Sequence, residues 1–213
     1  MARKRHRRND GFYDAFIQPS VRHAIGQYVQ NNSGYERVAD DLELTEIYKN
    51  ALARRIVTAP IDDSVKNWLK IKGDVDDKIL QYMETINVEG AFAEAGYWDR
   101  LYGRSCIFVM ADDGGKADDP VNLNKLESIK GLVVYDKRSI VEDQSGMLLN
   151  DDPNDGNFGK TEYYTIIPPN GQQMTVHHSR LLMFDGEILP KYERIQNNGA
   201  GLSCLNGVIK AIR

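Results

Sequence analysis

Trp98-Asp99-Arg100-Leu101-Tyr102-Gly103-Arg104-Ser105-Cys106-Ile107-Phe108-Val109-Met110 is the stretch in which the pattern of apolar residues changes. Before Gly103 these residues recur at the three- and four-residue spacing of a helix, and after it the period becomes that of an extended strand. Gly103 suits the left-handed position that follows the last turn of many helices. The stretch therefore predicts a helix that passes directly into a strand.

Upstream of this junction the sequence predicts three helices. Asp40 and Glu43 stand where N-cap and N3 residues would, and Pro60 is expected to stop the first helix. A short extended piece around Trp68 follows and closes at Gly73. A second helix is expected from Asp74, and it forms a hairpin near residues 89–90 with the third, which runs to Gly103. The apolar face of the first helix consists of Leu44, Ile47, Tyr48, Ala51, Leu52 and Ile56.

Downstream of the junction the sequence predicts six strands, joined by polar connections rich in Asp, Asn and Gly. Helices followed by strands indicate an α+β fold with a mostly antiparallel, multi-stranded β region. Residues 202–212 have apolar residues at helical spacing, and the chain is expected to end inside that helix. The six strands cover residues 106–110, 132–135, 139–142, 163–167, 174–177 and 181–184.

Length and composition are those of a folded protein. The chain has 213 residues, of which 41% are hydrophobic and 27% are charged, enough for one domain with or without an arm. Residues 1–40 are interpreted as a basic, irregular arm and residues 41–213 as the domain. The net charge is -4, yet five cations at the start of the arm are candidates for contact with nucleic acid or a scaffold. They are Arg3, Lys4, Arg5, Arg7 and Arg8.

The sequence favours a soluble, intracellular protein. No apolar stretch follows the basic start, as it would in a signal peptide, and no window is long and apolar enough to span a membrane. Cys106 and Cys204 are 98 positions apart, so neither a C-x-x-C metal site nor a disulfide framework is supported. Both cysteines are expected as reduced, partly buried thiols.

Two loop motifs have some of the features of a cofactor or metal site. Gly159-Lys160-Thr161 resembles the end of a phosphate-binding loop, but position 154 is Asn154 instead of glycine and a strand follows where a helix is needed. The acidic residues between 151 and 162 match part of a calcium-binding loop, but Pro153 occupies a ligand position and no helices flank it. We therefore expect no cofactor and no metal.

His177-His178-Ser179 resembles half of a two-histidine phosphoesterase site. In such a site one imidazole accepts a proton and the other donates one, so two copies of the motif are needed. Neither His6 nor His23 begins a second copy. No G-x-S-x-G nucleophile turn occurs either. A polar turn between two strands is the favoured interpretation, and no catalytic residues are assigned.

Four blocks of sequence, taken in order, resemble the tailed-phage portal proteins of the DUF1073-like group. In the first block a helix ends in a proline turn, followed by two acids and by a basic-Asn-Trp sequence that enters a strand. The second block passes from helix to strand. The third contains His-x-Ser-Arg, and the fourth starts the helix that follows. The third continues through Gly186 and Leu189-Pro190. The blocks read ARRIVTAPIDD (53–63) with KNW (66–68), LYGRS (101–105), VHHSRLL (176–182) and GLSCL (201–205).

The resemblance implies a homo-oligomeric ring, usually a dodecamer, at one capsid vertex, through which DNA is packaged and ejected. Portals of this type are structural proteins and not enzymes. They are found in the virion, and in the host cytoplasm during assembly. The implied partners are other portal subunits, capsid proteins and scaffold proteins, with no membrane. In these terms this chain would form the N-terminal part of a portal, which is much of the α+β wing. Terminase and DNA would contact the stem, clip and crown, which are expected to follow position 213.

The residues of these blocks also have a physical interpretation. Trp68 offers an apolar face to the helices, either Asp62 or Asp63 can bond to nearby backbone amides, and Arg180 can hold a carboxylate within the subunit or across a subunit boundary. Fold stabilisation explains each residue about as well as assembly does. A competing hypothesis is a phosphodiesterase that degrades cyclic oligonucleotide defence signals, a domain sometimes associated with such sequences. The candidate structural or assembly residues are Arg54, Arg55, Pro60, Asp62, Asp63, Trp68, Tyr102, Gly103, His177, Ser179, Arg180 and Gly186.

Overall fold

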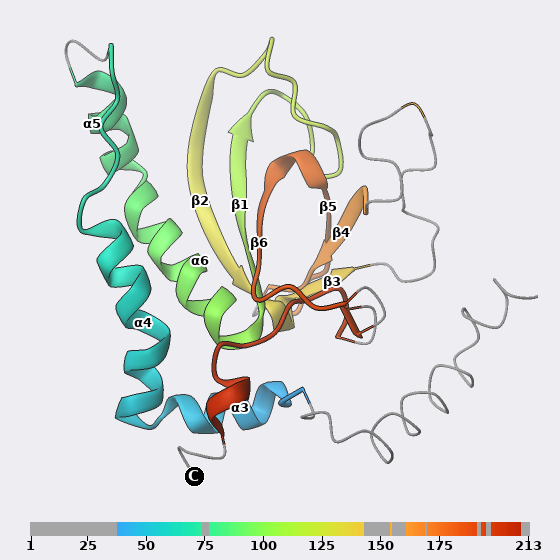
Figure 1. Ribbon diagram of the computed structural model, residues 1–213. Coiled ribbons are helices and arrows are strands. Elements are labelled where there is room, and N and C mark those ends of the chain that lie inside the picture. Colours follow the sequence, from blue (N-terminus) through green and yellow to red (C-terminus); the bar gives the residue numbers. More distant parts are fainter. Residues whose placement is uncertain are drawn as a thin grey trace, which may run out of the picture. The chain divides into compact units, whose positions relative to one another are not determined.

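The computed structural model describes residues 38–73, 77–142, 154, 161–168, 170–190, 193–194 and 197–209. All of them belong to one compact unit, Val38–Arg213. The basic residues at positions 3–8 and most of the predicted arm lie outside the described residues, so the predicted boundary near position 40 stays a prediction. The described elements form the α+β fold with antiparallel sheets that the sequence predicts, as Figure 1 shows.

Helices occupy the first half of this unit. The first predicted helix starts where expected, because the Asp40 side chain accepts a hydrogen bond from the Leu42 amide at 2.9 Å. It breaks after Tyr48, and a new helix begins where Asn50 accepts from the Leu52 amide at 2.8 Å. Asparagine is a strong N-cap residue, which explains the break. The helices are α3 (Asp41–Tyr48), α4 (Ala51–Val65), α5 (Lys78–Thr85) and α6 (Val88–Tyr102).

Pro60 does not end α4, and the prediction that it does is wrong. The helix continues to Val65, although proline has no N–H to donate to the carbonyl of Ile56. Arg100 of α6 supplies the missing donor: its Nη2 donates to the Ile56 carbonyl at 3.1 Å, and its Nε donates to Val57 O at 3.0 Å. A residue 44 positions away in sequence therefore satisfies the carbonyl that proline leaves open.

The hairpin predicted near Glu89 and Gly90 is also wrong. The break lies at Asn87, whose φ is 51°, and residues 89–90 belong to the first turn of α6. Helices α5 and α6 follow each other end to end instead of folding back (Figure 1). The predicted start at Asp74 lies outside the described residues, and the segment around Trp68 contains no strand among residues 66–73.

All six predicted strands are present and form two antiparallel sheets of three strands each. One sheet has the order β2-β1-β6 and the other has the order β3-β4-β5. A 3-10 turn at Lys137–Ser139 leads from β2 to β3, and another at His178–Arg180 leads from β5 to β6. The strands are β1 (Arg104–Asp112), β2 (Ser128–Asp136), β3 (Ile140–Glu142), β4 (Tyr163–Ile166), β5 (Met174–His177) and β6 (Leu181–Asp185).

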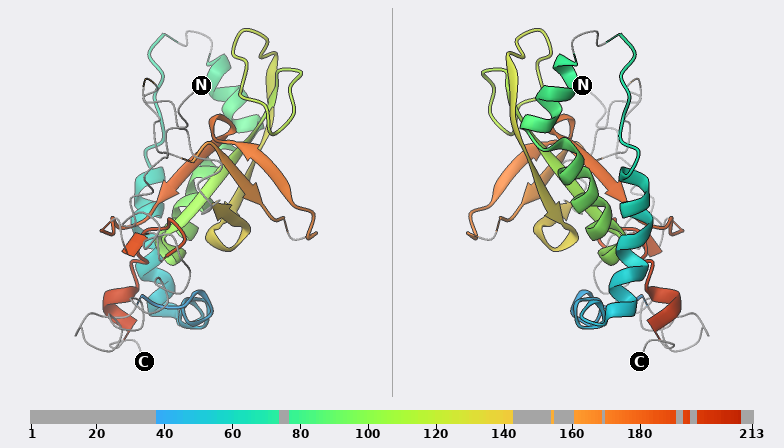
Figure 2. Two further views of the ribbon diagram at one scale, coloured as in Figure 1. Left: turned by 90° about the vertical axis from the view of Figure 1, so that its right-hand side faces the viewer. Right: turned by 90° about the vertical axis from the view of Figure 1, so that its left-hand side faces the viewer.

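Strand β1 lies between β2 and β6, and its first four residues are buried. Side chains alternate along a strand, so Ile107 packs with Ala91 and Ala95 of α6, whereas Cys106 packs with residues of the second sheet, among them Ile166 and Val176. Helix α6 thus covers one face of the first sheet, and the second sheet packs on the other; Figure 2 shows the two sheets from both sides. A further core joins α3, α4, α6 and the segment around Leu205.

The last predicted helix is only partly confirmed. Leu202 does not belong to it, because its backbone pairs with Glu187 in an isolated β-bridge. A 3-10 turn follows at Asn206–Val208, and Leu205 and Ile209 are buried. Residues 210–213 lie outside the described part of the chain.

Candidate assembly site

Gly103 is the point where three backbone segments meet. Its φ is 81°, and its carbonyl accepts the amides of Gly186 at 3.0 Å and Gly201 at 2.8 Å. A Cβ at position 103 would lie 2.2 Å from the carbonyl oxygen of Gly201. Glycine is therefore required here both for its backbone angle and for the close approach. This junction joins the second, third and fourth sequence blocks, which lie far apart in the chain.

The buried side chain of Arg104 joins the same segments by hydrogen bonds. Its Nε donates to Oδ1 of Asp185 at 2.8 Å, and its Nη1 donates to the carbonyl of Asn198 at 3.3 Å. Asp185 also pairs with Arg194. The carboxyl of Asp99 lies nearby with a buried Oδ1 that has no hydrogen-bond partner among the described residues, and burial together with the Asp185 charge raises the pKa of Asp99 to about 6.

His177, Ser179 and Arg180 form a polar turn between β5 and β6, as predicted. The Nδ1 atom of His177 lies 2.9 Å from Ser179 Oγ and accepts the Ser179 amide at 3.2 Å. Its Nε2 lies 3.8 Å from Glu162 Oε1. Burial and the neighbouring His178 lower the pKa of His177. The two contacts with Ser179 hold the imidazole against its own turn.

Arg180 finds its carboxylate within the subunit. Its Nη2 donates to both oxygens of Asp113, at 3.0 and 2.9 Å, and both side chains are buried. Its Nε donates to the carbonyl of Asp119 at 2.7 Å. Asp113 also accepts the amides of Asn122 and Gly115, and these backbone bonds with the guanidinium lower the pKa of Asp113 to about 2.

The loop between β1 and β2, residues 113–127, is therefore held at several points; we call it the clamped loop. Besides the bonds of Arg180, the Val121 amide donates to Ser179 Oγ at 2.9 Å, and the His177 amide donates to the carbonyl of Ala117 at 3.0 Å. The third sequence block thus holds a loop that is distant in sequence. The sequence alone does not single out Asp113, which is one of the two acids directly before Gly114-Gly115.

The first sequence block forms contacts between α4 and α6. Asp62 accepts from the hydroxyl of Tyr97 at 2.7 Å and from Arg55 at 3.3 Å, and the bond to Asp62 raises the pKa of Tyr97 to about 12. Asp63 pairs with Lys66. Among the described residues neither aspartate accepts a nearby backbone amide, because α4 continues through this region and its amides are used within the helix.

The remaining candidate residues lie along the same helical layer. Trp68 packs edge-on against Phe92 of α6 with ring centres 5.8 Å apart. The guanidinium of Arg54 lies 5.7 Å from the ring centre of Tyr48, and Tyr102 stacks under Arg138 at 4.7 Å. The structure thus separates the candidate residues into the α4–α6 contacts, the glycine junction and the turn at residues 177–180.

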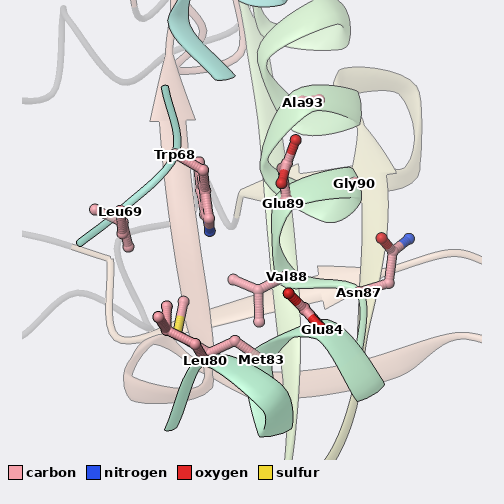
Figure 3. A pocket seen from close by; sticks show the side chains of 10 residues that line it. All are labelled: Trp68, Leu69, Leu80, Met83, Glu84, Asn87, Val88, Glu89, Gly90 and Ala93. Carbon is pink, nitrogen blue, oxygen red and sulfur yellow. The ribbon is translucent and has the colours of Figure 1, made fainter. Parts of the chain in front are cut away.

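A pocket of about 570 Å³ opens where residues 68–69 approach the α5–α6 junction. Figure 3 shows its lining: Trp68 and Leu69 come from the segment after α4, and Leu80 and Met83 come from α5. Glu84 and Glu89 add two carboxylates to a mostly apolar lining. None of this was identifiable from the sequence, because the pocket is formed by three separate segments.

The motifs that resemble phosphate and calcium sites fall mostly outside the described residues. Thr161 is described and buried, whereas Gly159, Lys160 and Asp151 to Pro153 lie in the parts left out. Within the described ranges no three His, Cys, Asp or Glu side chains are grouped so that they could hold a metal ion. No helix in that part of the chain is long and apolar enough to cross a membrane.

The buried arginines and the glycine contacts of the sequence blocks are thus used within the fold, between segments that are distant in the chain. The family model described as phage portal protein matches residues 43–213. The chain therefore belongs to the phage portal protein family, as the four sequence blocks predicted. No curated protein matches the chain.

Proposed function

We propose that this chain is a structural subunit of a portal ring at one capsid vertex, used for packaging and ejecting DNA. The observation that carries the proposal is the family match, which begins at residue 43 within α3 and includes almost every described element. In this proposal residues 41–213 form much of the wing, and the other subunits of the ring, capsid proteins and scaffold proteins are its partners. Terminase and DNA bind mainly to parts of the portal beyond the wing.

The uses of the motif residues support a structural role. Gly103, Gly186 and Gly201 bring three backbone segments together, and Arg180 holds the clamped loop through Asp113. His177 is bonded to Ser179 within its own turn. We therefore assign no catalytic residue, and we expect no turnover of cyclic nucleotides by the purified chain.

Labelling of virions tests the proposal. An antibody raised against residues 41–213 should mark a single vertex of each disrupted phage particle in electron micrographs, and loss of the protein should leave capsids without DNA. Labelling of every vertex, or of none, would contradict the proposal. Hydrolysis of cyclic dinucleotides that is lost in His177→Ala would favour the enzymatic alternative.

The basic residues Arg3 to Arg8 are proposed to contact DNA or a scaffold protein during assembly. Cations that neutralise phosphates release counterions, so DNA binding through this segment would weaken steeply as salt rises. Removing residues 1–8 should abolish such binding. DNA binding that persists unchanged in the shortened chain would exclude this role.

A further inference from the structure

The clamped loop exposes a leucine at a fixed position. Leu123 is 78% exposed, although the loop around it is held by the bonds of Asp113, Ser179 and Arg180. The Lys125 amide donates to the carbonyl of Asn122 at 3.0 Å and closes a tight turn with Leu123 inside it. A large apolar side chain that is presented rigidly loses little entropy when it binds, so it is suited to contact another molecule.

The pocket lined by Trp68, Leu69, Leu80 and Met83 complements the clamped loop in polarity and charge. Its apolar side chains leave room for an aliphatic group, and Glu84 and Glu89 place two carboxylates at it. Neither carboxylate is ion-paired within the described ranges, and the same is true of the Lys125 ammonium, two positions beyond Leu123. The loop thus carries an apolar group and a cation, and the pocket carries an apolar lining and two anions.

Two sides of α5 are used differently: one contacts the start of β2, and the other lines the pocket. Tyr82 of α5 contacts the start of β2, where its hydroxyl accepts the Ile129 amide at 2.9 Å. Leu80 and Glu84 line the pocket, and each is two positions from Tyr82. Because successive residues of a helix are about 100° apart, side chains two positions apart point in nearly opposite directions. The start of β2, where the clamped loop ends, and the Leu80 and Glu84 side of the pocket therefore lie on opposite sides of α5.

We propose that Leu123 of the clamped loop inserts into the pocket of a neighbouring copy of this chain, where Lys125 pairs with Glu84 and Glu89. The contact rests on the proposed function, because a portal ring places identical subunits next to each other. It joins two different surfaces of those subunits. Such a contact is heterologous, and heterologous contacts generate rings when the rotation between subunits closes. The charges select the neighbour and its orientation, and the leucine supplies the buried anchor.

Disulfide trapping between two variants of the full chain tests the contact. Leu123→Cys and Leu69→Cys, one of them carrying a mass tag, are mixed and oxidised; both positions are exposed, so folding is preserved. We expect a mixed disulfide at least about tenfold faster than in the control mixture of Leu123→Cys with Leu52→Cys, because docking raises the local thiol concentration. Leu52 is similarly exposed but lies on α4, away from the pocket. Equal rates in the two mixtures would overturn the proposal.

Charge exchange tests the ionic part. Lys125→Glu in the loop partner should reduce trapping about tenfold, and Glu84→Lys with Glu89→Lys in the pocket partner should restore it. Trapping that is indifferent to these charges would overturn the pairing. The outcome is separable from that of the proposed function: single-vertex labelling of virions with no trapping would reject this contact alone, whereas failed labelling would reject the portal role.

Discussion

At the scale of single residues, the absence of a side chain at glycines and the hydrogen bonds of buried arginines hold distant segments of this chain together. The sequence predicts Gly103 at the helix end, because the left-handed position is a local property. Its contact with Gly201 has no such signal, since the two residues are 98 positions apart. Arg180 was expected to hold a carboxylate, but the identity of Asp113, 67 positions away, could be found only in the folded chain.

Two glycines with similar backbone angles separate the effects of strain and of crowding. Gly114 has a φ of 73° and a Cβ added there would have no atom within 4 Å, whereas a Cβ at Gly103 would meet the Gly201 carbonyl. Gly114→Ala should cost about 1 kcal/mol in the free energy of unfolding, the strain of the left-handed angle alone. Gly103→Ala should cost more than about 4 kcal/mol or prevent folding. Urea unfolding measures both, and equal losses would contradict the close contact.

Asp99 predicts a dependence of stability on pH. Its pKa is about 6 in the folded chain against an ordinary value of 3.8, so folding favours the protonated form, and stability is lost as pH rises from about 4 through 6. Asp99→Asn should therefore be more stable than wild type at pH 7 by about 1–2 kcal/mol, with allowance for solvent screening. The difference should vanish near pH 4. A difference that stays constant between these pH values would show that the charge is not responsible.

At the scale of elements, the sequence predicted the strands better than the helix boundaries. Each strand has a clear apolar pattern over a few residues, and all six are present. The helix boundaries failed for two different reasons. Asn50 acts as a second N-cap inside one continuous apolar pattern, and Pro60 is tolerated because Arg100 completes the hydrogen bonding from another helix. The second cause depends on tertiary contact and has no local signal.

The relation between Pro60 and Arg100 can be measured by a double-mutant cycle. Arg100→Ala should destabilise the chain by about 1–3 kcal/mol, because the Ile56 carbonyl then loses its donor. In the background of Pro60→Ala, whose new amide can donate to that carbonyl, the same change should cost about 1 kcal/mol less. Strict additivity of the two changes in urea unfolding would contradict this account.

The clamped loop should open when its arginine is removed. Arg180→Ala leaves Asp113 without its guanidinium and frees the Asp119 carbonyl, so trypsin should cleave after Lys116 or Lys125 roughly tenfold faster than in wild type. Arg180→Lys keeps the charge but lacks the planar set of donors that reaches both partners. Its cleavage rate should fall between the two. Identical rates in all three proteins would mean that other contacts hold the loop.

At the scale of the whole molecule, the α+β class and the family were accessible from sequence, but the arrangement was not. The strand orders β2-β1-β6 and β3-β4-β5 follow from pairings between distant segments, such as that of Ile107 with Leu182. The pocket depends on residues from three elements. The sequence could therefore predict membership in a class of assembly proteins, while the surfaces through which copies of the chain meet required the fold.

A heterologous contact can be recognised by mixing two variants, one with a defective loop and one with a defective pocket, because each variant keeps the surface that the other has lost. Leu123→Glu impairs the loop but keeps the pocket, and Leu69→Arg impairs the pocket, by repelling Lys125, but keeps the loop. Each variant alone should stay monomeric at concentrations where wild type associates beyond dimers. Mixed together they retain one intact loop and one intact pocket, so they should form a one-to-one dimer that cannot grow, because its two free surfaces are both defective. Native mass spectrometry of the mixture distinguishes this dimer by its two subunit masses. A mixture that behaves as the sum of its separate components would show that the loop and the pocket do not meet.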